Sequence, residues 1–132
     1  MEINTRRLER NPRIRVMTNT TVASANQNDG GWSVTLKTAP KYVNERCTAC
    51  DACTAVCPGK VKDPFNLEMC EVPAIRLCHP DAWPHIYSLS RKACPDGCTK
   101  CVEVCTFKAI DLDAKETEET VEVSSVVAAT GW

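Results

Sequence analysis

Residues 47–58 of this chain read Cys-Thr-Ala-Cys-Asp-Ala-Cys-Thr-Ala-Val-Cys-Pro, and this stretch decides the fold. The four cysteines have the spacing C-x2-C-x2-C-x3-C, and a proline follows the last of them. Three thiolates at this spacing in a tight loop can hold three corners of one iron–sulfur cube, whereas the fourth points away towards a second cube. Zinc sites instead use separated C-x2-C pairs that close tetrahedrally on one ion. The spacing therefore favours iron–sulfur clusters over zinc.

A second cysteine run, Cys94-Pro-Asp-Gly-Cys98-Thr-Lys-Cys101-Val-Glu-Val-Cys105, repeats the first with one departure. Its first gap holds one residue more than the corresponding gap of the first run. Pro95-Asp96-Gly97 is a turn sequence, and Gly97 can absorb the extra residue by adopting a positive φ. We expect the ligand geometry to survive this insertion.

In a motif of this type the fourth cysteine of each run binds the cluster that the other run builds. The prediction is a first [4Fe–4S] cluster on Cys47, Cys50, Cys53 and Cys105, and a second on Cys94, Cys98, Cys101 and Cys57. Metal–thiolate bonds that cross between two distant segments replace much of the apolar burial that a small domain needs. No catalytic residue is expected, because thiolates held on iron are not free to attack a substrate.

The composition agrees with a metal-stabilised chain. Ten cysteines stand beside only seven aromatic residues among 132, so an ordinary hydrophobic core would be thin. Residues 1–14 are rich in charge and contain no apolar run, so we expect no signal peptide, no membrane span and a cytoplasmic, reducing location. A formal net charge of −1 does not predict a basic, nucleic-acid-binding surface.

Residues 1–40 predict a β-ribbon. After a short helical stretch, residues 13–18, 20–26 and 32–38 each alternate in the manner of a strand. Asn28-Asp29-Gly30-Gly31 supplies a hairpin turn between the last two. Trp32, Val34 and Leu36 share one face of the ribbon. Because a lone ribbon is marginally stable, we expect it to pack on something else.

Residues 41–115 predict the cluster domain. Short strands are expected at residues 42–43, 74–77, 86–89 and 109–112, and a helical turn or two after Asp51. The rest of residues 60–93 contains four prolines and predicts an irregular insertion. In residues 116–132, small apolar side chains from Ser125 to Gly131 follow one another without alternation, which is typical of a strand in a parallel sheet.

Cys70 and Cys78 lie outside the two runs. They are interpreted as ordinary thiols, with two alternatives: a disulfide between them, or a third metal site with His79 and His85. Trp83 and Tyr87 either cover a cluster from water or pack the insertion.

Several segments together resemble the ferredoxin insertion in the A subunit of heterodisulfide reductase. They are Lys41-Tyr-Val-Asn, the run from Cys47 to Pro58, Pro64-Phe-Asn, Ala74-Ile-Arg-Leu with the prolines after it, and the second run with Lys108-Ala-Ile-Asp-Leu-Asp. The closing Val-Val-Ala-Ala-Thr-Gly131 is the more specific part of the likeness, which covers residues 13–132.

The resemblance implies an α+β fold, with a two-cluster ferredoxin-like module interrupting an FAD-binding domain. Residues 1–40 would be a β-ribbon of the flavoprotein, 41–115 the ferredoxin domain and 116–132 the return strand. It also implies a part of an oxidoreductase that exchanges electrons with the flavin domain of its parent protein and with partner subunits. Five scattered glycines cannot form a dinucleotide-binding loop, so FAD is expected only in a larger parent protein. A zinc-stabilised interaction module and a free-standing small ferredoxin are the alternatives.

Overall fold

The computed structural model describes residues 2–131, with side chains from residue 4 onward. The chain divides into two compact units, one made of residues 41–114 and the other of the segments 1–40 and 115–132. Mixed α/β structure with small antiparallel sheets, as expected from the sequence, is present in the described residues.

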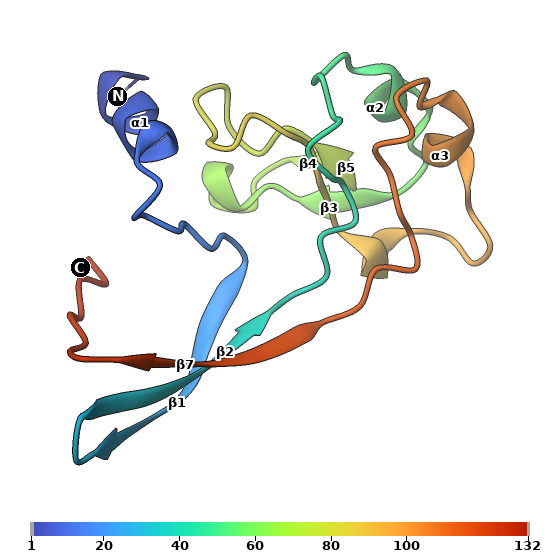
Figure 1. Ribbon diagram of the computed structural model, residues 1–132. Helices are drawn as coiled ribbons and strands as arrows, with labels where there is room; N and C mark the ends of the chain where they lie inside the picture. Colours follow the sequence, from blue (N-terminus) through green and yellow to red (C-terminus); the bar gives the residue numbers. More distant parts are fainter. Residues whose placement is uncertain (1, 132) are drawn as a thin grey trace. The chain divides into compact units, whose positions relative to one another are not determined.

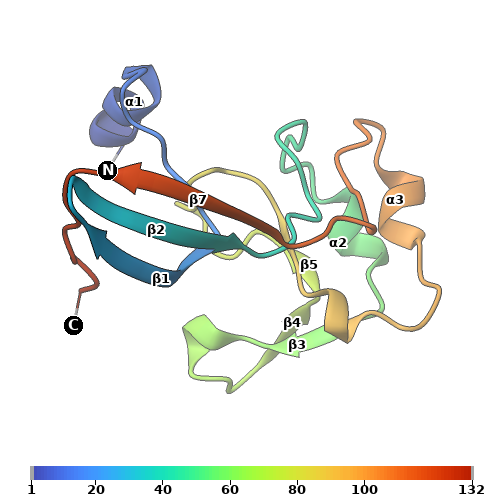
Figure 2. The same cartoon turned by 60° about the horizontal axis from the view of Figure 1, so that its bottom comes forward.

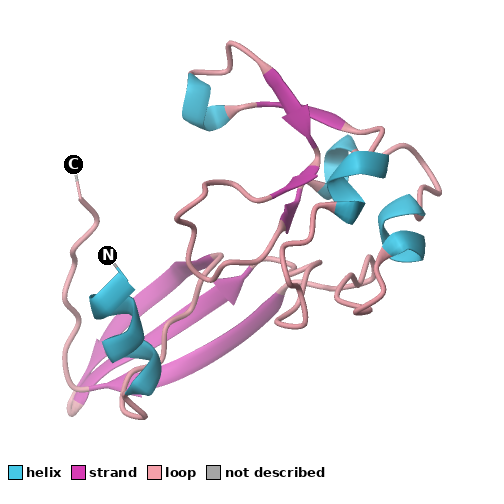
Figure 3. Cartoon of the chain, turned by 90° about the horizontal axis from the view of Figure 1, so that it is seen from above, coloured by secondary structure: helices cyan, strands magenta, loops and turns pink. Residues whose placement is uncertain are grey.

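The unit built from the two ends of the chain is organised on a three-stranded antiparallel sheet, in the order β1-β2-β7 (Figure 1). The strands are β1 (Thr20–Asn28), β2 (Gly31–Thr38) and β7 (Thr117–Val123). Helix α1 (Glu2–Arg10) begins the described chain. Figure 3 shows the three strands as one twisted sheet. The predicted ribbon therefore gains a third strand, β7, which lies about 80 residues further along the chain.

The hairpin turn forms where the sequence predicts it, and Gly31 is required there. Gly31 pairs with Asn28 across the turn and has a φ of 149°. A Cβ at Gly31 would collide with the backbone carbonyl of Val123, because β7 passes directly beside it. Trp32 and Val34 pair with Val123 and Val121, so β7 extends the expected apolar face of the ribbon by two valines.

Two strand predictions in this unit are not met. Residues 13–18 alternate in sequence but form no strand, since β1 begins at Thr20 and no described segment pairs with them. Residues 125–131 are irregular, and Val127 is 85% exposed. A parallel strand needs neighbours on both sides to satisfy its backbone groups. The described residues provide no such neighbours.

The unit of residues 41–114 contains short elements joined by loops (Figure 2). Helices α2 (Ala52–Val56) and α3 (Lys100–Val104) each lie in one cysteine run and contact each other. Strands β5 (Ile75–Arg76) and β6 (Ser88–Leu89) form an antiparallel pair, and Val43 forms a single bridge with Ile110. All four short strands predicted around the cysteine runs are represented in these pairings.

The insertion between the cysteine runs has more structure than the sequence predicts. Strands β3 (Lys60–Lys62) and β4 (Glu71–Pro73) form a hairpin, with the 3-10 turn η1 (Pro64–Asn66) at its tip. A second 3-10 turn, η2 (Arg91–Ala93), leads into the second cysteine run. Three-residue strands carry too little periodicity to be recognised from sequence.

The two halves of this unit are related by a repeated hydrogen-bond pattern. The backbone N–H of Asn44 donates to the carbonyl of Ala109 at 2.8 Å, and that of Ser90 donates to the carbonyl of Ala74 at 2.8 Å. Each donor lies shortly before a cysteine run, and each acceptor lies after one. The first strand of each half therefore pairs with the last strand of the other half, which brings the two runs together.

The core of the unit is small and consists partly of cysteine. Its buried members are Val43, Cys53, Ala74, Ile75, Tyr87, Leu89, Cys101 and Ala109. Of these only Ile75 is a large side chain with no exposed surface. Apolar burial alone gives a unit of this size little stability. Bonds from the cysteines at its centre to a metal would therefore add stability that the apolar core lacks.

Candidate functional site

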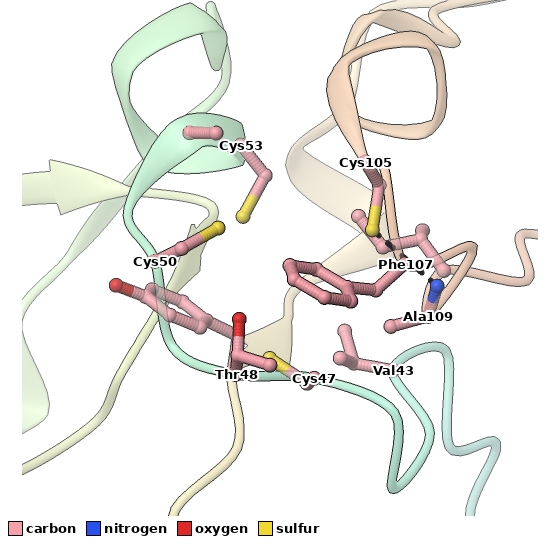
Figure 4. A pocket seen from close by; sticks show the side chains of 11 residues that line it. Val43, Cys47, Thr48, Cys50, Cys53, Cys105, Phe107 and Ala109 are labelled. Atoms are coloured by element: carbon pink, nitrogen blue, oxygen red, sulfur yellow. Dashed lines mark hydrogen bonds between the residues drawn. The ribbon is translucent and has the colours of Figure 1, made fainter.

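Four cysteines from the two runs line one cavity in the unit of residues 41–114. They are Cys47, Cys50, Cys53 and Cys105, which we call the first cysteine set. Figure 4 shows their sulfur atoms around the cavity, with the ring of Phe107 among them. The other lining residues are Val43, Thr48, Ala52, Tyr87, Phe107, Ala109 and Ile110. The cavity is partly open, and its empty volume is about 340 Å³ when the adjoining solvent space is counted with it. Three members come from one end of α2 and its preceding loop, and the fourth follows α3.

The loop before α2 turns tightly because two of its residues adopt left-handed backbone conformations. Ala49 has a φ of 54° and Asp51 a φ of 63°, on either side of Cys50. Neither residue is glycine, so each of these conformations costs free energy on the order of 1 kcal/mol. The backbone N–H of Cys47 donates to the carbonyl of Asn44 at 3.1 Å, which closes the start of the loop. The result is a loop with three thiols along one cavity wall.

Cys105 reaches the same cavity from the end of α3, where it is the C-terminal capping residue. The backbone N–H of Ala109 donates to the sulfur of Cys105 at 3.3 Å. A donor of this kind stabilises negative charge on a sulfur atom, as at metal-bound thiolates. Lys108, with a φ of 49°, turns the chain so that this amide comes back to the sulfur.

Tyr87 forms a wall of the cavity and is itself almost fully buried. Its hydroxyl donates a hydrogen bond to the carboxylate of Asp51, in the loop of the first run. Burial and then this hydrogen bond raise the pKa of Tyr87 to about 12, so the phenol keeps its proton at neutral pH. Tyr87 lines the cysteine cavity and also packs in the core with Ile75 and Leu89, so its position fits both functions that the sequence leaves open, covering a cluster and packing the insertion.

The remaining members of the two runs are Cys57, Cys94, Cys98 and Cys101, which we call the second cysteine set. Gly97 has the positive φ that the sequence predicts, at 68°, so the extra residue is accommodated in a turn before Cys98. Cys101 is buried, and burial raises the pKa of its thiol. The nearby charges of Cys94 and Cys98 raise it further. These three cysteines therefore lie within electrostatic reach of one another. Cys57 donates through its sulfur to the carbonyl of Gly59 at 3.6 Å.

The buried thiols are poor anions by themselves. Burial raises the pKa of Cys53 to about 11, and the backbone N–H groups around it oppose that change only in part. A thiolate at such a position needs a positive partner, and a metal centre provides one by displacing the proton. The chemistry of this donor set therefore fits metal binding.

The described side chains do not converge on a point. No three His, Cys, Asp or Glu side chains of the described residues are arranged to hold a single metal ion. The first cysteine set instead surrounds a space, and a cubane cluster takes its ligands at separate corners. All ten cysteines are free thiols, so the alternative disulfide between Cys70 and Cys78 is not formed. Cys70 is exposed and accepts a hydrogen bond from the side-chain amide of Asn66 at 3.2 Å.

Two residues of this site were not predicted from the sequence. Phe107 lines the cavity, and Asp51 binds Tyr87. The position of Phe107 two residues after the last cysteine was the available signal, whereas nothing local connects Asp51 with a tyrosine in the insertion.

The fold and the cavity together define a small cysteine-rich α/β protein with a candidate metal-cluster centre. No model of a protein family matches the chain. It is 36% identical over 125 residues to the A subunit of the ferredoxin:CoB-CoM heterodisulfide reductase of Methanosarcina acetivorans, covering 92% of this chain and 16% of that protein. It is 32% identical over 122 residues to the iron–sulfur A subunit of the CoB–CoM heterodisulfide reductase of Methanocaldococcus jannaschii, covering 92% and 18%.

A third relative is the A subunit of the H(2)/formate:CoB-CoM heterodisulfide,ferredoxin reductase of Methanococcus maripaludis, at 34% identity over 122 residues, 92% of this chain and 18% of that protein. The chain is thus homologous, over nearly all of its length, to one segment of the heterodisulfide reductase A subunit, as its motifs suggested. It spans about a sixth of the length of these relatives. Among the described residues, no helix has the length and apolarity needed to span a bilayer.

Proposed function

We propose that this chain carries electrons through two [4Fe–4S] clusters, as the ferredoxin-like module of a flavin-dependent oxidoreductase related to heterodisulfide reductase. The observation that carries the proposal is the first cysteine set itself. Cys105 lines the same cavity as Cys47, Cys50 and Cys53, although it belongs to the other run. Crossed ligation of two cubes requires this arrangement.

In this proposal the first cysteine set holds one cluster, and the second cysteine set holds the other. Each cluster, when bound, supplies a one-electron change of charge at four iron atoms. The chain supplies the thiolates, the apolar wall formed by Val43, Phe107 and Ile110, and the amide of Ala109 aimed at the sulfur of Cys105. Such walls and sulfur hydrogen bonds set reduction potentials.

The relatives' names support an oxidoreductase role and the presence of partners. Of the three relatives described above, two carry ferredoxin in their names and one is named for iron and sulfur. Each is named as the A component of its enzyme, which implies other subunits. We propose that the present chain exchanges electrons with the flavin domain of a larger parent protein and with such subunits. FAD itself would be bound by that larger protein, since this chain has no dinucleotide-binding glycine loop.

The test is the iron and acid-labile sulfide content after anaerobic purification and reconstitution. The proposal predicts about eight iron and about eight sulfide per chain, a brown colour that bleaches with dithionite, and a paramagnetic reduced state. A colourless protein that contains zinc would instead support a zinc-stabilised interaction module. Replacement of Cys70 by serine is the matched control, because this exposed thiol lies outside both sets and should leave the iron content unchanged.

A further inference from the structure

We propose that Tyr87 is a positioning residue for the first cysteine set. Its hydroxyl holds Asp51, and through Asp51 it keeps the Cys50–Cys53 loop in the conformation that presents these thiols to the cavity. The inference rests on the proposed function, because it concerns the residues that would hold one of the two clusters.

The loop needs such a restraint because its backbone is strained. Ala49 and Asp51 both occupy the left-handed region, which non-glycine residues enter at a cost. Helix α2 has five residues, and the side chain of its N-cap residue, Asp51, makes no capping hydrogen bond. A helix this short contributes little stability by itself. The loop conformation must therefore be stabilised by contacts from outside the run.

Tyr87 provides this contact from a segment that is anchored in the core. It directly precedes β6, whose Leu89 pairs with Ile75 of β5 in the buried core. The same strand pair also holds α2, because the hydroxyl of Thr54 donates to the carbonyl of Ile75 at 3.1 Å. The β5–β6 pair thus fixes the first run at two points, the loop through Asp51 and the helix through Thr54.

The ring and the hydroxyl of Tyr87 have separable roles. The ring lines the cavity beside Cys47, Cys50 and Cys53, where it excludes water. The hydroxyl is directed to Asp51 and not to a sulfur atom. Tyr87→Phe keeps the ring and removes the hydroxyl, together with its bond to Asp51 and its contact with the Thr54 side chain. Tyr42→Phe is the matched control, since Tyr42 is the other tyrosine of the chain and does not line the cavity.

The experiment measures iron release from the reconstituted protein to a ferrous chelator under anaerobic conditions. In Tyr87→Phe, half of the iron should leave about tenfold faster than in the wild type, as expected for a lost hydrogen bond to a charged group. The other half, on the second cysteine set, should leave at the wild-type rate. Tyr42→Phe should release all of its iron at the wild-type rate.

Two substitutions of Asp51 separate a tether from a general packing role. Asp51→Asn keeps an oxygen acceptor and tolerates the left-handed backbone. Its iron should therefore leave more slowly than that of Asp51→Ala, at a rate close to the wild type. Asp51→Ala should release half of the iron at least as fast as Tyr87→Phe, because alanine loses the bond and also fits the left-handed backbone less well than aspartate. In the double variant Tyr87→Phe/Asp51→Ala the two accelerations should not add, because both changes break the bond between Tyr87 and Asp51.

The inference is overturned if iron-loaded Tyr87→Phe releases iron at the wild-type rate, or if both halves of its iron leave faster together. Additive effects of the two substitutions would also overturn it. A wild-type protein that holds no clusters after reconstitution is a different failure: it refutes the proposed function, and the positioning role with it.

Discussion

Cys53 and Cys105 line one cavity, although Cys53 lies in α2 and Cys105 caps the end of α3. The chain brings them together by pairing the first strand of each half with the last strand of the other. The backbone bonds from Asn44 to Ala109 and from Ser90 to Ala74 are the visible result. If clusters occupy the two sets, the bonds to iron add a second crossing to the one that the backbone makes.

Substitution of Cys53 should remove iron and destabilise the unit together. Cys53 is buried in the small core and belongs to the first cysteine set. We expect Cys53→Ser to lose about half of the bound iron or more, and to lower the midpoint of chemical denaturation, because metal binding and folding are coupled. Metal analysis and anaerobic denaturant titration measure the two effects. Cys70→Ser should change neither the iron content nor the midpoint. If Cys53→Ser held as much iron as the wild type, Cys53 would be excluded as a ligand.

A side chain at Gly31 should destabilise the sheet, whereas a side chain at the neighbouring Gly30 should be tolerated. A Cβ at Gly31 meets the backbone of Val123, and the residue has a positive φ. We expect Gly31→Ala to destabilise the sheet by about 1–3 kcal/mol. Hydrogen exchange of the β2 and β7 amides would measure this loss. Gly30→Ala is the control, because a Cβ there has open space, and equal exchange in both variants would contradict the prediction.

Gly59 should be needed for the close approach of the two cysteine runs. A Cβ at this position would lie 2.5 Å from the carbonyl oxygen of Ala93 and 3.1 Å from the side chain of Ala74. We expect Gly59→Ala to cost about 1–3 kcal/mol in the free energy of unfolding, through overpacking at this contact. Denaturant titration of the iron-loaded protein measures the change. A midpoint within experimental error of the wild type would show that the two segments separate readily.

Removal of iron should affect the two units differently. The unit of residues 41–114 has a thin core centred on cysteines, whereas the sheet of β1, β2 and β7 contains none. After treatment with a chelator, we expect faster hydrogen exchange at Val43, Ile75 and Leu89 and unchanged exchange in β2. Protection that persists at all three core amides would mean that the unit folds without metal.

The sequence predicts the features that depend on local pattern. The hairpin turn at residues 28–31 and the positive φ of Gly97 both follow from glycine chemistry, and both are present. The homology to the A subunit of heterodisulfide reductase could also be recognised from the motifs. The pairing of β2 with β7 was missed, because a strand rich in glutamate and threonine has a weak apolar signal and its partner is distant in the chain.

The other features that the sequence did not predict depend on contacts between distant segments or on very short strands. The bond from Tyr87 to Asp51 connects the insertion with the first run, and no periodicity indicates it. The β3–β4 hairpin consists of strands of three residues, which are too short to show alternation. The strand expected at residues 125–131 has the composition of a parallel strand, but its neighbours would have to come from outside the described residues.

The most direct test of the central claim is the iron content of two double variants, Cys47→Ser/Cys105→Ser and Cys47→Ser/Cys57→Ser. If ligation is crossed, the first pair removes two ligands of the same cluster, and about four iron per chain should remain. The second pair removes one ligand from each cluster, so little iron should remain. Retention of about four iron by Cys47→Ser/Cys57→Ser, with loss from Cys47→Ser/Cys105→Ser, would contradict the account.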